Sequence, residues 1–377
     1  MASNHIVEVC AIKNVISHKQ ADSLEIVIIK EWECIVKKGK YKKGEKIIFI
    51  PPDSILPTEL ADQLGVRNYL AGPNKDRVKC ARLRGVMSFG LVMDMPEGEY
   101  WKVGTDVKEH FGITKYDPPI RTAAGDAESE DLFFDKFTDI QNLRHYPEVF
   151  KEGEKVVVPE KIDGTQSRTN VSLKNTFLSK LFPLLFSSKI IWKAGSHNVK
   201  RKQPPKDKLA GNIYWYPFTL PSVQNLMNFL IKTKRFRFKN ITLYGEIYGR
   251  ITGGLKLMNY GIPNELGYVA FGLKIDGEYI SWNIFKEYCN MFEVEIVPVI
   301  GEIPFNMARI KEMSEGDSLL AKRHGAQHMR EGVVVLPIRE RNDPDIGRAI
   351  LKLHSDTYLD KKNKREAKGE VVDYTDN

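Results

Sequence analysis

The stretch VVVPEKIDGTQSR, residues 156–168, constrains the fold of this chain more than any other. Its three valines predict a buried strand, which we expect to end at the proline that follows them. Lys161 comes next, between Glu160 and Asp163, and Gly164 allows a ligand to approach the backbone closely. A lysine becomes nucleophilic where its surroundings lower its pKa. These residues alone fit a reactive lysine and a solvated surface turn about equally well.

Four further motifs follow in order along the chain. They are LYGE at 243–246, YVAFG at 268–272, REGVVV at 330–335 and AILKL at 349–353. Together with the first stretch, they resemble motifs I, III, IIIa, IV and V of the covalent nucleotidyltransferases. That superfamily contains ATP-dependent DNA ligases, RNA ligases and mRNA capping enzymes, and the resemblance covers residues 140–366. It implies an α+β nucleotidyltransferase domain that is ATP-grasp-like, with antiparallel sheets and helices.

The resemblance assigns catalytic and metal-binding roles to four residues. It implies that Lys161 attacks the α-phosphate of ATP and that Lys352 contacts the same phosphate as a catalytic and nucleotide-binding residue. Asp163 and Glu331 would hold Mg²⁺ or Mn²⁺, which are oxygen-seeking cations. A free lysine titrates near ~10.4, so we expect burial and the cation to lower the pKa of Lys161.

The same resemblance implies a nucleotide pocket formed by Glu160, Glu246 and Phe271 as well as Lys352. Glu246 would accept hydrogen bonds from the ribose, Phe271 would stack on adenine, and Glu160 would orient the pocket. Seen alone, Phe271 fits a core aromatic better. Two positions depart from the family pattern: His354 replaces the second lysine of Lys-x-Lys, and His197 replaces the arginine of a Ser-Arg-Asn-like motif.

The first part of the chain predicts a small all-β domain, because short β-rich runs alternate with turn signals. An OB-fold suits this pattern, and the sequence resembles the N-terminal OB module of one branch of RNA ligases. Its basic connector, Lys37–Lys43, together with Arg82 and Arg84, is consistent with a nucleic-acid groove. Lysines that protect edge strands from pairing are an equally good interpretation.

The predicted domain organisation follows from these patterns. We expect an OB-fold-like domain at 1–112, a linker at 113–135, the nucleotidyltransferase (adenylylation) domain at 136–366 and a flexible tail at 367–377. Within the catalytic domain, strands are predicted at 241–247, 267–274, 278–282, 293–299, 330–337 and 348–354. Helices are predicted at 222–231, 285–291, 303–321 and 356–366. The role of the segment 172–240, which contains apolar and basic blocks, stays open.

Composition adds limits on partners and location. The 377 residues carry a net charge of +8, which favours a polyanionic partner such as RNA. Four scattered cysteines without a CxxC pair argue against a disulfide framework or a zinc site. No signal peptide or membrane span is expected, so the prediction is an intracellular monomer, cytoplasmic or in a host cell if viral.

The first hypothesis is therefore an ATP-dependent RNA ligase that seals 3′-hydroxyl and 5′-phosphate RNA ends or nicks, through lysyl–AMP and an RNA-adenylate. Its partner would be RNA, as a nicked duplex or paired ends. A DNA ligase or a GTP-using capping guanylyltransferase is less consistent, since the 25 residues after Lys352 leave no room for the OB domain that follows motif V in those enzymes. A non-catalytic RNA-binding relative is also less consistent, because such a protein has no need of a reactive lysine.

Overall fold

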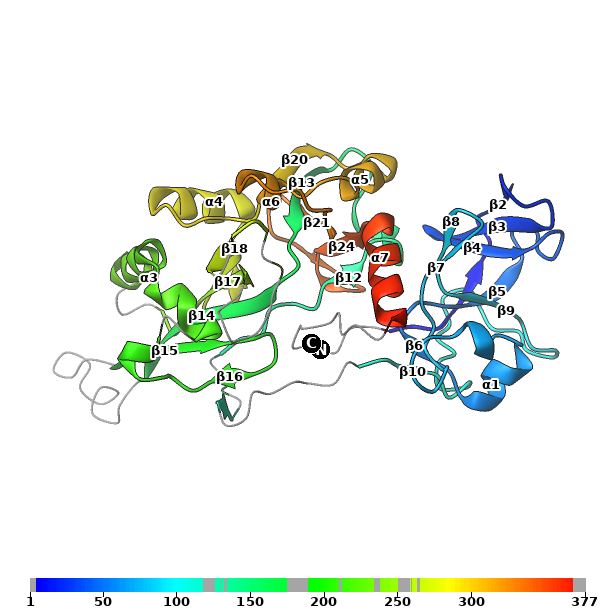
Figure 1. Cartoon of the computed structure of the whole chain (residues 1–377), viewed down its shortest axis with the longest axis horizontal. Coiled ribbons are helices and arrows are strands. Elements are labelled where there is room, and N and C mark those ends of the chain that lie inside the picture. Colours follow the sequence, from blue (N-terminus) through cyan, green and yellow to red (C-terminus); the bar gives the residue numbers. More distant parts are fainter. Residues whose placement is uncertain are drawn as a thin grey trace. The chain divides into compact units, whose positions relative to one another are not determined.

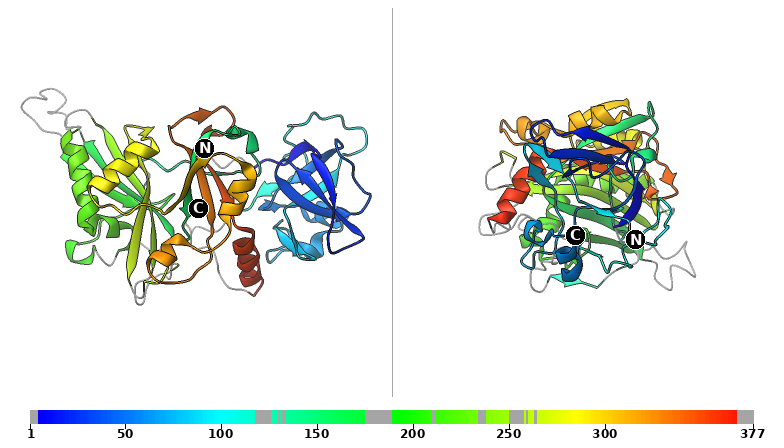
Figure 2. Two further views of the ribbon diagram at one scale, coloured as in Figure 1. Left: turned by 90° about the horizontal axis from the view of Figure 1, so that it is seen from above. Right: turned by 90° about the vertical axis from the view of Figure 1, so that its right-hand side faces the viewer.

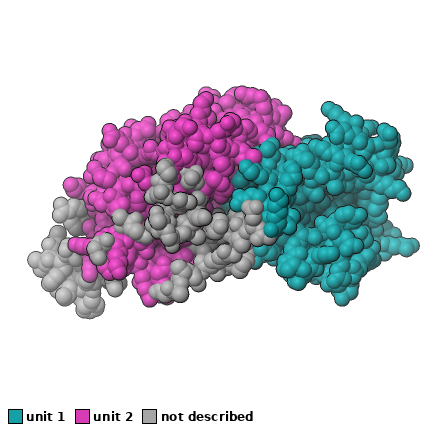
Figure 3. Space-filling view, viewed as in Figure 1, with its two compact units in different colours: residues 1–118, 139–151, 351–372 teal, residues 119–138, 152–350, 373–377 magenta. Residues whose placement is uncertain are grey.

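The structure is a computed structural model. It describes residues 5–117, 126–129, 131, 134–174, 189–209, 212–233, 238–249, 258, 260–262 and 265–368. The backbone forms two compact units, coloured separately in Figure 3: unit 1 is 1–118, 139–151 and 351–372, and unit 2 is 119–138, 152–350 and 373–377. The segments 139–151 and 351–372 thus group with unit 1, and the predicted domain bounds stay a prediction. The apolar block at 181–186 lies outside the described residues.

Unit 1 contains the OB-fold, formed by two three-stranded antiparallel sheets (Figures 1 and 2). One sheet has the order β1-β5-β9 and the other the order β2-β3-β4. The strands of these sheets are β1 (Glu8–Ala11), β2 (Asn14–Ser17), β3 (Leu24–Ile29), β4 (Trp32–Lys37), β5 (Lys46–Ile50) and β9 (Leu91–Asp94). The other elements of unit 1 are β6 (Ser54–Ile55), α1 (Thr58–Gln63), η1 (Arg67–Tyr69), β7 (Ala81–Leu83), β8 (Val86–Ser88), β10 (Thr114–Lys115), β12 (Gln141–Asn142), η2 (Pro147–Val149), β24 (Leu351–His354) and α7 (Asp356–Ala367).

Strand β5 is buried on both faces, which explains its uninterrupted apolar sequence. Ile47 and Phe49 pack into a cluster with Trp32 of β4, between the two sheets. The alternate residues Ile48 and Ile50 pack into a second cluster that includes side chains of α1. Because successive side chains of a strand point to opposite faces, one strand serves both cores.

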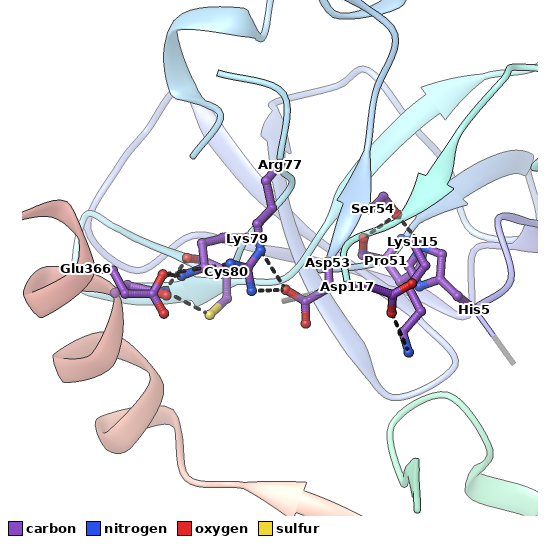
Figure 4. A network of polar contacts seen from close by, with 11 residues as sticks. His5, Pro51, Asp53, Ser54, Arg77, Lys79, Cys80, Lys115, Asp117 and Glu366 are labelled. Atoms are coloured by element: carbon purple, nitrogen blue, oxygen red, sulfur yellow. Dashed lines mark hydrogen bonds and ion pairs between the residues drawn. The ribbon is translucent and has the colours of Figure 1, made fainter. Parts of the chain in front are cut away.

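Helix α7 is part of unit 1 and carries acidic side chains that pair with cations of the OB-fold. Figure 4 shows Glu366 of α7 paired with Lys79, and Arg77 bound to Asp53. Arg82 of β7 pairs with Asp360 at 3.2 Å and donates to the Gly85 carbonyl at 2.9 Å. Arg82 is therefore used in docking α7. The Lys37–Lys43 connector remains the predicted basic surface of this module.

Unit 2 contains a seven-stranded antiparallel sheet and a three-stranded antiparallel ladder. The sheet has the order β11 (Ala127–Glu128), β16 (Lys200–Arg201), β15 (Lys189–Gly195), β14 (Thr165–Lys174), β17 (Asn240–Gly249), β18 (Leu266–Ile275) and β19 (Glu278–Tyr279). The ladder places β13 (Lys155–Lys161) between β20 (Val299–Pro304) and β21 (Gly332–Pro337). The remaining elements are η3 (Lys206–Lys208), η4 (Ile213–Thr219), α3 (Pro221–Thr233), α4 (Trp282–Met291), α5 (Met307–Ser314), α6 (Leu319–Arg323), β22 (Asn342–Asp343) and β23 (Gly347–Arg348).

The α+β class with an N-terminal OB-fold is confirmed, and several local predictions are wrong. The first strand does not end at Pro159: β13 continues to Lys161, with a register shift between Val158 and Pro159 in its pairing with β20. The helix expected at 303–321 is two helices, α5 and α6, because Ser318 caps the second one. Within the strand expected at 293–299, Ile296 makes an isolated bridge and β20 begins only at Val299. The strand expected at 278–282 is shorter, because β19 ends at Tyr279 and α4 begins at Trp282.

The sequence does not predict strand β14, because the residues of this strand, TQSRTNVSLK, are polar. Thr169 and Asn170 are nevertheless fully buried. Asn170 donates to the Ile241 carbonyl at 3.1 Å and to the Thr242 hydroxyl at 2.8 Å. Hydrogen bonds within the sheet therefore replace the apolar alternation that predicts most strands.

Among the described residues, no helix is long and apolar enough to cross a membrane.

A glycine on β18 makes room for an aromatic ring of the neighbouring strand. Gly267 pairs directly with Tyr248 of β17, and a Cβ at Gly267 would collide with the Tyr248 ring. The ring covers the glycine backbone, an arrangement that compensates for the weak strand preference of glycine.

We predict that Gly267→Ala lowers the stability of the protein by about 1–3 kcal/mol, because overpacking forces the Tyr248 ring to move. The expected result is a thermal midpoint several degrees lower. The comparison is Gly272→Ala on the same strand, whose Cβ would meet the Phe137 ring at 3.3 Å, a tight contact that a shift of a few tenths of an ångström relieves. Equal midpoints for the two variants would contradict the prediction.

Candidate functional site

Strand β13 carries Lys161 at its last position. In the antiparallel ladder, Lys161 pairs with Gly332 and Glu160 pairs with Val333 of β21. Glu331 immediately precedes β21, so the register brings it beside the lysine. Because side chains alternate along a strand, Glu160 and Lys161 point to opposite faces.

The predicted nucleophile forms an ion pair with a predicted metal ligand. Lys161 Nζ donates to Glu331 Oε1 at 2.8 Å. The Lys161 side chain is 26% exposed and the Glu331 side chain is 8% exposed. A nearly buried carboxylate thus fixes a lysine that solvent and ligands can still reach.

Glu246 of β17 and Asp163 add two more carboxylates close enough to act on Lys161. The pKa of Glu246 is raised to about 8, mainly by burial. Lys161 lowers this pKa, and the neighbouring carboxylates of Glu331 and Asp163 raise it further. Asp163 is positioned through its backbone, since its N–H donates to the Tyr260 hydroxyl at 2.7 Å. The predicted motif residues Lys161, Asp163, Glu246 and Glu331 therefore share one site.

The protein's own groups raise the pKa of Lys161, and the expectation that burial together with a bound cation lowers it stays a prediction. Burial does lower this pKa, but the carboxylates of Glu331, Glu246 and Asp163 outweigh burial. Three nearby acids stabilise an ammonium group strongly, and only the fold shows that all three lie near Lys161. The protein's own groups therefore hold Lys161 protonated.

These carboxylates fit a divalent cation by their chemistry. Three acids around one lysine leave excess negative charge, and carboxylate oxygens are the ligands that Mg²⁺ and Mn²⁺ prefer. Within the described residues, no group of three or more His, Cys, Asp or Glu side chains is arranged to hold a metal ion. Mg²⁺ commonly keeps several waters and needs one or two carboxylates. The metal-binding roles of Asp163 and Glu331 stay predictions.

Glu160 is buried and binds protein backbone. Its Oε2 accepts from the N–H groups of Leu319 and Leu320, at 2.8 and 3.2 Å, at the beginning of α6. Its other oxygen has no hydrogen-bond partner within the described residues. Burial raises the pKa of Glu160. The contacts are those of a residue that ties β13 to α6, while its predicted pocket role stays a prediction.

Phe271 lies at an irregularity of the sheet. The register between β17 and β18 shifts between Tyr244 and Gly245, so Phe271 falls between the partners of these two residues. Its ring is partly exposed and meets the Phe137 ring edge-on, with centroids 5.0 Å apart. Bulges of this kind re-aim side chains near functional sites. This placement suits a stacking surface better than a fully buried core aromatic.

Lys352 lies on β24 in unit 1, paired with Asn142 of β12, and its carbonyl accepts from Leu143 N at 2.9 Å. Its predicted contact with the α-phosphate stays a prediction.

His197, one of the two departures from the family pattern, has a polar partner. Its Nδ1 lies 2.7 Å from Gln166 Oε1, and Gln166 pairs with Glu246 across the sheet.

Tyr260 and Gln166 are neighbours of the site that sequence reasoning did not single out. Tyr260 binds a backbone group of the motif, and Gln166 stands opposite a motif carboxylate. Neither contact leaves a pattern in the sequence, because each depends on segments far apart in the chain. Only the pairing of β14 with β17, had β14 been predicted, could have indicated Gln166.

Two family models match the chain. One described as RNA ligase matches residues 154–354, and one described as an OB-fold domain matches residues 6–95. No curated protein matches it.

Solved structures of the Naegleria gruberi RNA ligase are similar to this chain. A variant with AMP and Mn is 22% identical with a TM-score of 0.71, covering 95% of this chain and 99% of that one. Another variant, with ATP and Mn, is 22% identical with a TM-score of 0.71, covering 96% and 100%. The ligase with pyrophosphate is 22% identical with a TM-score of 0.70, also covering 96% and 100%. At this identity the likeness shows a shared fold.

We predict that Glu246→Gln stabilises the protein relative to wild type by an amount that increases as the pH rises. Glu246 has a pKa of about 8 in the fold, above its ordinary value of 4.5. Its stabilising contribution is therefore complete below about pH 4.5 and is lost as the pH rises through about 8. Glutamine is neutral at every pH and avoids this loss.

The measurement is the thermal midpoint of both proteins at pH 5 and pH 9 without divalent cations. The midpoint of the variant relative to wild type should rise between these values. The control is Glu302→Gln, since Glu302 is on an exposed face of β20. A difference for Glu246→Gln that does not change with pH would contradict the assignment.

Proposed function

Because the chain belongs to the RNA ligase family, we propose that it uses ATP to seal RNA 3′-hydroxyl and 5′-phosphate ends through a lysyl–AMP intermediate. The observation that carries this proposal is Lys161 at the end of β13, bound to Glu331 and close to Glu246 and Asp163. The Naegleria gruberi structures that contain ATP or AMP with Mn support a nucleotide and a divalent cation as ligands here.

In the proposed first step, the lone pair of Lys161 Nζ forms a P–N bond with the α-phosphate of ATP. The bond from that phosphorus to the bridging oxygen breaks, and pyrophosphate leaves with its electron pair. Nζ must first lose a proton, and Glu331 Oε1, at 2.8 Å, accepts the hydrogen bond along which this proton points. The raised pKa of Lys161 makes this deprotonation the demanding part of the step.

In the later steps, the P–N bond breaks and AMP passes to the 5′-phosphate of the RNA. The 3′-hydroxyl then attacks that phosphate, and AMP leaves as the phosphodiester forms. Lys161 ends the cycle as a free amine, so one residue serves every turnover. This order separates one difficult ligation into transfers that each have a good leaving group.

Asp163 and Glu331 are the residues that we propose would hold Mg²⁺ or Mn²⁺. When bound, such an ion neutralises phosphate charge and would also offset the carboxylate excess of the site. Of the remaining residues, Glu246 would bind the ribose, Phe271 would stack on adenine, and Glu160 would fix the pocket wall through α6. Lys352 would contact the α-phosphate.

We propose RNA as a nicked duplex or paired ends as the substrate, and the OB-fold as the part that adds RNA affinity. The connector Lys37–Lys43 supplies cations for the RNA backbone. The protein would act as a monomer inside the cell, in the cytoplasm or in a host cell if it is viral.

We predict that Lys161→Ala and Lys161→Arg abolish transfer of label from radiolabelled ATP to the protein. Arginine keeps the positive charge but stays protonated and cannot attack phosphorus. Both variants should still seal RNA that carries a 5′-adenylate, which serves as the control for folding and RNA binding. Covalent label on Lys161→Ala, or label on the wild type from GTP in preference to ATP, would overturn the proposal.

We also predict that Asp163→Asn and Glu331→Gln slow adenylylation and shift its dependence on Mg²⁺ to higher concentrations. Each change removes one negative oxygen donor from the site. Titrating the rate of protein labelling against Mg²⁺ measures the shift, with Glu302→Gln as the control carboxylate. Titration curves equal to wild type in both variants would exclude the metal role.

A further inference from the structure

Helix α7 has one face that is entirely engaged with unit 1. Five residues of this face are spaced by three, one, three and three positions, which places them on one side of a helix. They are Asp356, Leu359, Asp360, Asn363 and Glu366. The N-terminus of the helix is fixed as well, because the side chain of the preceding serine accepts from the backbone N–H three residues on.

Each of these residues has a partner within unit 1. The partners are Arg144 for Asp356 at 2.7 Å, Arg82 for Asp360 at 3.2 Å, the Cys80 carbonyl for Asn363 at 2.7 Å, Lys79 for Glu366, and the core cluster of the OB-fold for Leu359. Figure 4 shows the end of this face, where Glu366 meets Lys79 and Cys80 lies alongside. The acidic side chains of α7 are thus used in docking the helix.

The side of α7 next to this docking face is basic and exposed. Its cations are Lys361, Lys364 and the C-cap residue Lys368, which follow at steps of three and four residues, about one helical turn, and all three are exposed. Within the described residues, only Lys364 of these three makes an ion pair, with Asp360 at 2.9 Å, and its side chain is still 68% exposed. Docking of one face therefore leaves a row of three exposed cations beside it.

We propose that this row, Lys361, Lys364 and Lys368, is a binding surface for the phosphate backbone of RNA. This inference rests on the proposed function and deepens it by naming where the substrate is bound. Cations spaced by one helical turn, about 5.4 Å, can contact successive phosphates along a strand. Such contacts carry no sequence preference, as suits an enzyme that must join ends of any sequence.

Two features favour RNA over a lipid surface. A helix that lies on a membrane inserts an apolar face beside its basic one. The apolar residue of the docking face, Leu359, is packed against the OB-fold core. The same unit also carries Lys352 on β24, the strand directly before α7. The proposed RNA-binding row therefore follows a predicted catalytic lysine closely along the chain.

The test uses the full chain with Lys361→Ala, Lys364→Ala and Lys368→Ala combined. Dissociation constants for a nicked RNA duplex are measured from 50 to 200 mM salt. The slope of log affinity against log salt should fall in magnitude by about two to three, close to one for each phosphate that the variant can no longer bind. At the low-salt end the variant should bind more than about tenfold more weakly.

The control changes the same number of charges elsewhere, with Lys19→Ala, Lys151→Ala and Lys155→Ala, all exposed positions. Protein–AMP formation from ATP without RNA should match wild type in both triple variants. A salt slope equal to wild type in the α7 variant would overturn this inference, as would an equal loss of RNA affinity in the control variant. It would also be overturned if the wild type bound phosphatidylserine vesicles and the α7 variant lost only that binding, with its RNA affinity unchanged. Failure of the wild type to form protein–AMP would instead overturn the proposed function.

Discussion

The ion pair between Lys161 and Glu331 is the interaction on which the site depends. A charged pair of low exposure is stable only if each partner stays in place, since removal of one leaves the other charge without compensation. The pairing of β13 with β21 meets that condition, because the register sets Lys161 opposite the residue after Glu331. The excess of carboxylates has a cost to stability, visible in the raised pKa of Glu246. Excess negative charge of this kind is typical of sites built for ligands that supply the missing positive charge.

Much of the site could be predicted from the sequence, because its residues stand at strand ends in short motifs. The resemblance of these motifs to a known family names Lys161, Asp163, Glu246 and Glu331, and the structure brings the four residues together. Their electrostatics could not be predicted so well. The direction of the Lys161 pKa depends on how many acids surround it, which only the fold reveals.

The parts of the fold that escaped prediction are those in which polar groups replace apolar ones. Strand β14 is buried through hydrogen bonds such as those of Asn170, and an apolar pattern cannot reveal it. Likewise, the hydrogen bonds from the first backbone groups of α6 to Glu160 leave no pattern in the sequence. The grouping of α7 with the OB-fold was also missed, since ion pairs such as Arg82 with Asp360 join residues far apart in sequence.

The docking of α7 gives unit 1 an order of assembly during synthesis. The strands of the OB-fold leave the ribosome first, and α7 follows only after residues 152–350 of unit 2 have been made. Until then, Lys79 and Arg82 lack their acidic partners and the core lacks Leu359. Domains commonly fold as they emerge, N-terminal first. A chain that stops before α7 would therefore retain an incomplete N-terminal unit, so that unit is complete only after residues 152–350 have been translated.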